Sequence, residues 1–217
     1  MDPSHPSLRH LVRSPRVKGA EPYPTLLLLH GRGADEADLL PLADDLDPRY
    51  FVVSARAPLP LGPGFAWYDL ADIGDPEPSS FDLSLNALTR FVAGLPDAYP
   101  IDRSQISILG FSQGAVMAGS LLLTHPELAV GTVMLSGYLP LDQKLPIDET
   151  KLANRRVFVG HGTADPLIPV AWARRVRDYF TRVGANLSYR EYPMTHAIGP
   201  DELDDVRTWG LGAATSP

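Results

Sequence analysis

The chain has 217 residues, of which 44% are hydrophobic and 21% are charged, and it contains no cysteine. This composition is typical of one globular domain, and the lack of cysteine excludes disulfides and any thiol nucleophile. The formal net charge of -7 disfavours nucleic acid and anionic lipid as partners, because both require a surplus of cationic side chains.

The first residues contain no uninterrupted apolar segment of the length that a signal peptide requires. No later segment approaches the roughly 18 apolar residues of a membrane span. We therefore expect a cytoplasmic protein without membrane insertion. No long linker divides the sequence, so we expect a single domain over residues 1–217. Within it, residues 1–20 are expected to form either a loosely ordered terminus or an edge strand.

Six short apolar runs, each bounded by turn residues, predict buried strands. Continuous apolar strands are typical of a parallel sheet that is covered on both faces. The runs lie at residues 25–29, 50–54, 106–109, 131–135, 157–159 and 187–192.

Helical patterns separate these strands. Apolar residues at spacings of three and four predict a helix over residues 79–95, which we expect Ser79 to cap with Asp82 as its partner. A similar pattern predicts a helix over residues 172–183, and the nearly uniform apolar segment 115–123 predicts a helix at the centre of the fold. Strands alternating with helices predict an α/β fold, with a mostly parallel central sheet and helices on both faces.

Residues 56–80 interrupt this regular alternation. They combine five prolines with aromatic side chains over a length that is unusual for a simple connection, so we expect a functional loop. From it we expect Leu59, Phe65, Trp67 and Tyr68 to bind substrate. No later insertion is long or apolar enough to form a hinged lid, which predicts an open, preformed site.

The strongest local signal is the run Gly110-Phe111-Ser112-Gln113-Gly114, which lies between the strand at 106–109 and the helix at 115–123. In this context the pattern G-x-S-x-G predicts a nucleophile elbow, a strained turn that presents a serine hydroxyl at the carboxyl edge of the sheet. Glycines two residues before and after the serine allow the chain to reverse without collision. Ser112 is therefore the predicted nucleophile.

A serine nucleophile needs a general base, and the base needs an acid that holds its tautomer. In this kind of fold the chain order is serine, acid, histidine. His125 ends the helix that carries the serine, so we expect a structural role for it. Asp165 lies at the tip of a strand, and the order Ser112, Asp165, His196 is satisfied only when His196 is the base. His161 is then expected to shape the turn that holds Asp165, with a catalytic role as the less favoured alternative.

Acyl transfer also needs two backbone donors for the oxyanion. The amide of Gln113, directly after the serine, is the first candidate. The second is the amide of Arg32 in His30-Gly31-Arg32-Gly33, where the glycines permit unusual backbone dihedrals. The alternative for this segment is a tight turn that only closes its strand. Histidine pairs and acidic loops with metal-ligand spacing are missing, so we expect no metal and no cofactor.

Five segments, in their order and spacing, carry a resemblance to a known family. They are Leu29-His30-Gly31-Arg32-Gly33, Trp67-Tyr68-Asp69, Gly110-Phe111-Ser112-Gln113-Gly114-Ala115, His161-Gly162-Thr163-Ala164-Asp165-Pro166, and His196. Together they resemble the phospholipase/carboxylesterase family of compact α/β hydrolases, which includes acyl-protein thioesterases and small bacterial carboxylesterases. The resemblance spans residues 24–211. It implies Ser112 as nucleophile, Asp165 and His196 as its partners, and the amides of Arg32 and Gln113 as the oxyanion hole.

The function expected on this basis is a serine carboxylesterase that acts on small-molecule esters with short to medium acyl chains through an acyl-enzyme. An acyl-protein thioesterase or a lysophospholipase-type acyl hydrolase would use the same residues. A non-catalytic α/β-hydrolase binding protein is a distant alternative, because such relatives usually lack a member of the triad. Arg32 stands where the family frequently has leucine, so we expect its side chain to attract a substrate carboxylate. The sequence is compatible with a homodimer and does not determine the oligomeric state.

Overall fold

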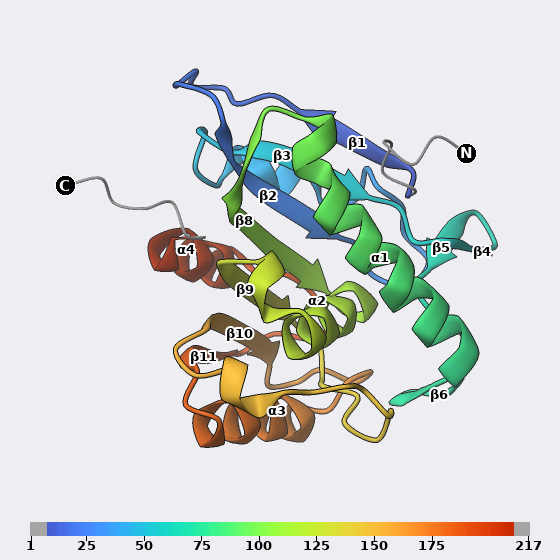
Figure 1. Ribbon diagram of the computed structural model, residues 1–217. Helices are drawn as coiled ribbons and strands as arrows, with labels where there is room; N and C mark the ends of the chain where they lie inside the picture. Colours follow the sequence, from blue (N-terminus) through green and yellow to red (C-terminus); the bar gives the residue numbers. More distant parts are fainter. Residues whose placement is uncertain (1–7, 211–217) are drawn as a thin grey trace.

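A seven-stranded sheet forms the centre of the computed structural model, which describes residues 8–210 (Figure 1). Its strands are β1 (His10–Arg13), β2 (Tyr23–Leu29), β3 (Phe51–Ala55), β8 (Ile101–Phe111), β9 (Gly131–Leu135), β10 (Arg156–Gly162) and β11 (Asn186–Tyr192). They lie in the order β1-β3-β2-β8-β9-β10-β11. Every neighbouring pair is parallel except β1 with β3. The predicted, mostly parallel sheet is confirmed.

The antiparallel strand β1 is the edge strand that was one of the two expectations for residues 1–20, although residues 1–7 lie outside the described part of the chain. Each of the six predicted strands is present, with ends that differ by a few residues. The largest difference is in β8, which begins at Ile101 instead of residue 106.

Within residues 8–210, four α-helices and three short 3-10 helices surround the sheet. They are α1 (Pro78–Ala98), α2 (Gln113–Thr124), α3 (Val170–Arg182) and α4 (Pro200–Trp209), with η1 (Leu40–Asp44), η2 (Pro126–Leu128) and η3 (Glu149–Lys151). Helices α1, α2 and α3 cover one face, and η1 and α4 cover the other (Figure 1). No helix within residues 8–210 is long and apolar enough to cross a membrane.

Alternation along β2 explains why residues 26–29 of this strand are all leucine. Leu27 and Leu29 belong to the core cluster beneath α1 and α2, whereas Leu26 and Leu28 belong to the cluster beneath α4. Because all four side chains are completely buried, each of these positions requires an apolar residue.

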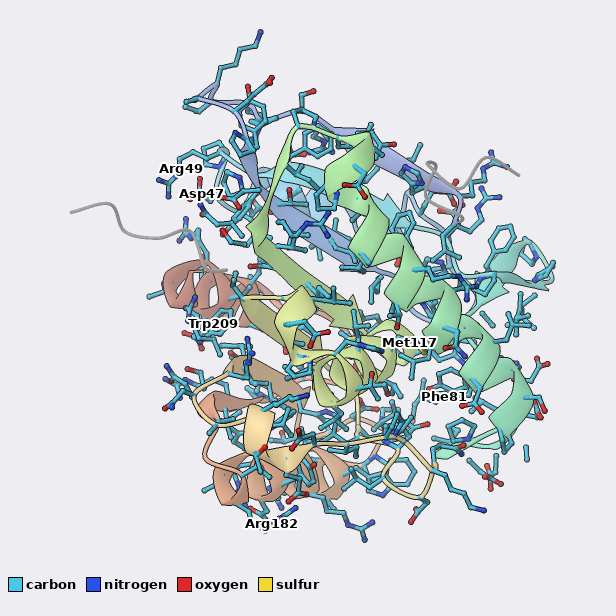
Figure 2. The ribbon with its side chains drawn as sticks, viewed as in Figure 1. Asp47, Arg49, Phe81, Met117, Arg182 and Trp209 are labelled. Carbon is cyan, nitrogen blue, oxygen red and sulfur yellow. The ribbon has the colours of Figure 1, made fainter. Side chains whose placement is uncertain are left out.

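Helix α2, which follows the elbow, is buried almost all round, as its uniformly apolar sequence predicts. Met117 of α2 and Phe81 of α1 are both completely buried and belong to the same cluster (Figure 2). Burial of a side chain of this size contributes about 1.5–3 kcal/mol, so the packing of α1 holds α2, and with it the elbow, in place.

The predicted cap of α1 is wrong. Glu77, not Ser79, is the N-cap, and its carboxylate accepts hydrogen bonds from the amides of Ser79 and Ser80 at 2.9 and 2.7 Å. Pro78 has no amide hydrogen and is suited to the first turn, so the helix begins before Ser79.

The irregular region 56–80 contains two small hairpins that the sequence did not reveal. One pairs β4 (Leu59–Leu61) with β5 (Gly64–Ala66), and the other pairs β6 (Leu70–Asp72) with β7 (Asp75–Pro76). Strands of two or three residues are too short to show hydrophobic alternation. The first hairpin supports the segment after β2, because Phe65 accepts a hydrogen bond from the Gly33 amide and donates one to the Ala34 carbonyl.

Helix α4 is attached to the sheet through an unusual contact. Glu202 is completely buried, and its carboxyl lies against the bare backbone of Gly160 in β10, where a β-carbon would be 2.2 Å from Oε1. Among the described residues neither carboxyl oxygen completes a hydrogen bond. Burial raises the pKa of Glu202 to about 8, and the nearby Gly199 amide offsets only part of this rise.

We expect Glu202→Gln to stabilise the protein in a pH-dependent way. A carboxyl whose pKa rises on folding favours the folded state below its unfolded pKa of about 4.5, and this contribution is lost as the pH rises towards 8. The wild type should therefore lose a few kcal/mol relative to the variant across this window, since each pKa unit corresponds to about 1.4 kcal/mol. Urea unfolding at several pH values measures the difference.

The control is Asp201→Asn, which changes an exposed carboxylate in the same helical turn. Its effect on the free energy of unfolding should be small across the whole pH range. A constant difference between Glu202→Gln and the wild type from pH 4.5 to 8 would contradict the assignment of a buried, protonated carboxyl.

Candidate active site

Three side chains from three strand ends meet at the carboxyl edge of the sheet. Ser112 follows β8, Asp165 follows β10 and His196 follows β11. His196 Nε2 lies 2.9 Å from Ser112 Oγ, and His196 Nδ1 lies 2.7 Å from Asp165 Oδ2. Since the carboxylate can only accept, Nδ1 donates to it, which leaves Nε2 to accept the hydroxyl proton. The structure thus brings the three sequence-predicted residues together in one hydrogen-bonded chain.

The side chain of Asp165 is completely buried, and its own loop compensates for this burial. Oδ1 accepts hydrogen bonds from the amides of Leu167 and Ile168, each at 2.9 Å, while Oδ2 faces His196. A buried carboxylate without such partners would be strongly unfavourable. The two amides also fix the rotamer of Asp165, so that Oδ2 points at the imidazole.

His161 lies at the end of β10 and contacts the turn that holds Asp165. It is completely buried, and its Nε2 donates to the carbonyl of Ile168 at 2.8 Å and lies 3.4 Å from Asp165 Oδ2. Burial lowers the pKa of His161, which keeps the ring neutral. This placement agrees with the turn-shaping role expected for it, and the lining of the cleft includes His196 but not His161.

The loops that carry Asp165 and His196 are interlocked. The amides of Thr163 and Ala164 donate to the carbonyls of Tyr192 and Met194 at 2.8 and 3.1 Å. Gly162 approaches the second loop so closely that a β-carbon would lie 2.3 Å from the carbonyl oxygen of Thr195. The distance between acid and base is therefore set by direct backbone contacts between their loops.

The serine sits on the strained turn that the sequence predicts. Ser112 has φ 54° and ψ -119°, a conformation that side-chain-bearing residues rarely adopt. β-Carbons at Gly110 and Gly114 would lie 2.2 Å from the Gly114 carbonyl oxygen and 2.0 Å from the Leu29 carbonyl oxygen, respectively. Both glycines are thus required by close backbone approach, which explains their positions on either side of the serine.

The two residues whose amides are the candidate oxyanion donors line the same cleft as Ser112. Gln113 is the first residue of α2, where amides have no partner within the helix, and Arg32 lies in the segment after β2. In the described part of the chain no hydrogen bond uses either amide. The positive end of the helix adds to the attraction for a negatively charged oxygen at this point.

The cleft above Ser112 has a volume of about 370 Å³ and is mostly apolar. Most of its apolar lining comes from residues 68–74 around the β6–β7 hairpin, the end of β8, the segment after β9 and the Asp165 loop. These residues include Tyr68, Leu70, Ile73, Gly74, Phe111, Tyr138, Leu167 and Ile168. Ile73 and Leu167 are 44% and 50% exposed, so the rim of the cleft is apolar as well.

Of the four predicted substrate-binding residues, only Tyr68 lines this cleft. Trp67 is completely buried behind it, and Leu59 and Phe65 belong to the neighbouring β4–β5 hairpin, where Arg56 stacks on the Phe65 ring at 4.2 Å. The structure therefore corrects the prediction for these three residues, because the hairpins direct other side chains of the same region towards Ser112.

Sequence reasoning missed most of the cleft wall. Leu70 and Ile73 are contributed by the unrecognised β6–β7 hairpin, and Tyr138 follows β9. Leu167 and Ile168 had a usable signal, since they lie two and three residues after the predicted acid at the tip of its strand.

The side chain of Arg32 is exposed at the cleft. Among the ion pairs of the described residues none involves Arg32. Asp38 also lines the cleft, so the site carries one side chain of each charge near its entrance. Within residues 8–210 no three His, Asp or Glu side chains are grouped so that they could hold a metal ion.

The sequence and the fold of this chain are similar to those of known proteins. The sequence matches the Phospholipase/Carboxylesterase family model over residues 12–209. It is 28% identical to acyl-protein thioesterase 1 of Mycosarcoma maydis, over 92% of this chain and 94% of that protein. A carboxylesterase structure from Bacillus cereus superposes with a TM-score of 0.85 at 26% identity, covering 95% and 94% of the two chains. A carboxylesterase from Mesorhizobium loti gives 0.79 at 30% identity, covering 85% and 87%.

The strain at Ser112 leads to a prediction about stability. Ser112→Gly should unfold at a higher denaturant concentration than Ser112→Ala, because glycine adopts this backbone conformation without steric cost. The difference in unfolding free energy should be about 1 kcal/mol, once the greater chain entropy of glycine is deducted.

The same pair of substitutions at Ser120, in the middle of α2, is the matched control. There the order should reverse, since glycine is about 1 kcal/mol less favourable than alanine inside a helix. Equal or lower stability of Ser112→Gly relative to Ser112→Ala would show that the elbow stores no strain.

Proposed function

Because the chain belongs to the phospholipase/carboxylesterase family of α/β hydrolases, we propose that it is a serine carboxylesterase that acts on small-molecule esters with short to medium acyl chains. The observation that carries this proposal is the hydrogen-bonded chain from Ser112 through His196 to Asp165, which opens directly into an apolar cleft. The hydroxyl, the base and the acid are already within hydrogen-bonding distance of one another.

In the proposed reaction, Ser112 Oγ attacks the ester carbonyl carbon while its proton passes to His196 Nε2. Asp165 stabilises the imidazolium that forms and keeps the ring oriented. As the carbon–oxygen bond to the alcohol breaks, His196 returns the proton to the departing alkoxide and leaves an acyl-enzyme. A water molecule then repeats the sequence: its proton passes to His196 as its oxygen attacks the acyl carbon, and His196 returns this proton to Ser112 Oγ as the bond to the serine breaks.

The amides of Arg32 and Gln113 are the proposed oxyanion hole. In each tetrahedral intermediate the former carbonyl oxygen carries the negative charge, and two fixed donors stabilise it without reorganisation. Both residues line the cleft with Ser112, and their amides make no competing hydrogen bond within the described residues.

The proposed acyl site is the apolar wall of the cleft, which includes Tyr68, Leu70, Leu167 and Ile168. The buried apolar area of the acyl group contributes affinity at about 25 cal/mol per Å². Within the described chain, the residues over the cleft belong to short hairpins and turns instead of a long amphipathic lid. We therefore propose that the site is open before substrate binds.

Thioesters are the second candidate substrates. The relative from Mycosarcoma maydis is named an acyl-protein thioesterase, and the proposed residues would perform the same two steps on a thioester. A thiolate leaves more readily than an alkoxide, so this reaction depends less on protonation by His196.

A substrate screen tests the proposal. Esters of p-nitrophenol with acyl chains of increasing length and an acyl thioester are assayed with the wild type and with Ser112→Ala. We expect the highest kcat/KM at short to medium chains, with no increase when long-chain substrate exceeds its micellar concentration. Ser112→Ala should lower kcat by roughly 10⁴ to 10⁶, with a normal melting temperature.

Covalent labelling with a fluorophosphonate supplies the site-specific control. The wild type should be modified at Ser112 alone, and Ser112→Ala should not react. Labelling of another residue, or turnover that survives in Ser112→Ala, would refute the proposed nucleophile. Turnover of the thioester and of no oxygen ester would replace the first candidate function by the second.

The side chain of Arg32 gives a separate prediction about specificity. Arg32→Ala keeps the backbone amide, so kcat on a neutral ester should change less than threefold, whereas losing an oxyanion donor costs roughly 10² to 10³. A substrate of the same length with a terminal carboxylate should lose kcat/KM, and the loss should shrink as salt screens the charge.

Arg49→Ala is the matched control, since Arg49 is exposed and pairs with Asp47 outside the cleft (Figure 2). It should leave both substrates unaffected. A hundredfold loss on the neutral ester in folded Arg32→Ala would mean that the guanidinium itself takes part in the reaction.

A further inference from the structure

The side chain of Gln113 makes contacts that the proposed reaction does not use. Its Oε1 accepts a hydrogen bond from the Trp67 amide at 2.9 Å, and its Nε2 donates to the Tyr68 carbonyl at 2.8 Å. Gln113 is only 4% exposed, so both bonds are protected from water. The carboxamide thereby ties the start of α2 to the backbone of residues 67–68.

Trp67 extends this connection to the other side of the cleft. Its indole Nε1 donates to the carbonyl of His30 at 2.9 Å, and its ring lies 5.7 Å from the His30 ring. The Trp67 carbonyl accepts a hydrogen bond from the Ser84 hydroxyl of α1. Because Trp67 is completely buried, its position is determined by these partners and not by solvent.

His30 completes the connection to the segment that carries Arg32. Its Nδ1 donates to the Gly31 carbonyl at 2.7 Å, and its Nε2 accepts from the Ala57 amide at 3.0 Å. This pattern requires a neutral ring, and burial lowers the pKa of His30 accordingly. A continuous, buried network therefore runs from Gln113 through Trp67 to His30 and Gly31.

We propose that the Gln113 carboxamide and the Trp67 indole are positioning groups of the oxyanion hole, which fix the Arg32 amide relative to the Gln113 amide. This inference rests on the proposed function. The two amides come from segments far apart in the sequence, and the network is a direct bridge between these segments. Donors must lie within about 2.7–3.1 Å of the oxyanion, and a displacement of about 1 Å can cost a factor of 10² in rate.

A purely structural role would have a different signature. If the carboxamide only satisfied the Trp67 amide and the Tyr68 carbonyl, its loss would lower the melting temperature and leave kcat of the folded enzyme unchanged. A positioning role requires that kcat falls in the folded enzyme while KM changes little, for every acyl chain alike, because all substrates share the oxyanion.

Gln113→Glu separates these alternatives through its pH dependence. A protonated carboxyl can accept from the Trp67 amide and donate to the Tyr68 carbonyl, as the carboxamide does, whereas an ionised one cannot donate. Burial beside a carbonyl oxygen raises the pKa of the introduced carboxyl. The ratio of kcat/KM in Gln113→Glu to that in the wild type should therefore rise at least tenfold from about pH 8 to about pH 5.5.

Two further variants test the bridge at constant pH. Gln113→Met removes both hydrogen bonds of the carboxamide, and Trp67→Phe removes the indole donor while it keeps the backbone amide and an aromatic ring. Each should lower kcat by roughly 10- to 100-fold on acetyl and octanoyl esters, with KM within about threefold. In the double variant the loss should be smaller than the product of the single losses, since both groups act through the same bridge.

Ser120→Ala is the matched control, because Ser120 is also completely buried in α2 and donates to the Val116 carbonyl at 2.7 Å. It should lower the melting temperature without changing kcat. All variants are assayed well below their melting temperatures after circular dichroism has shown native secondary structure.

A ratio for Gln113→Glu that does not change with pH, or kcat within twofold of the wild type in folded Gln113→Met or Trp67→Phe, would overturn the inference. If Gln113→Met and Trp67→Phe do not fold, the pH dependence of Gln113→Glu decides the question alone. Failure of the proposed function is a separate result, because it would appear as a wild type without ester or thioester turnover, or as an active Ser112→Ala.

Discussion

The reversal of the chain at Ser112 constrains the rest of the structure. The turn brings the Gly114 backbone against the carbonyl of Leu29, so β2 and the start of α2 must lie at one fixed separation. Strain of this kind costs about 1–3 kcal/mol and persists only where the surroundings determine the conformation. Here the surroundings are β8 in the middle of the sheet and α2, whose side chains are buried from Gln113 to Leu123.

The two sides of the site are held to this turn by different means. On one side, backbone contacts between two loops set the distance from Asp165 to His196, and amides of the Asp165 loop orient the carboxylate. On the other side, buried side chains connect the elbow with the segment after β2. Ser112 and His196 reach the cleft, whereas Asp165, Trp67 and His30 are buried.

The sequence predicted well what depends on neighbours along the chain. The apolar run of β2 and the glycines around Ser112 are local patterns, and the order of Ser112, Asp165 and His196 follows from strand ends that share one edge of a parallel sheet. The predicted cap of α1 was wrong because Pro78 shifts the start of the helix. The hairpins of residues 59–76 were not predicted because strands of two or three residues are too short to show hydrophobic alternation.

The cleft wall was the least predictable part, for a related reason. Aromatic residues near a site are equally suited to line it or to support it, and the sequence does not distinguish the two. Trp67 is buried and Tyr68 lines the cleft, although the two residues are adjacent. The Gln113 side chain fixes the backbone between them, and this backbone directs the two side chains differently. This choice depends on a contact between residues that are 46 positions apart.

The interlocked loops after β10 and β11 also bear on how such enzymes can diversify. Recombination between relatives that replaced the Asp165 loop alone would confront the carbonyls of Met194 and Thr195 with a backbone of another shape, and any residue larger than glycine at position 162 would collide with them. We therefore expect the two loops to be exchangeable only together. New specificities in this scaffold should arise mainly from the hairpins across the cleft, whose exchange leaves the spacing of acid and base intact.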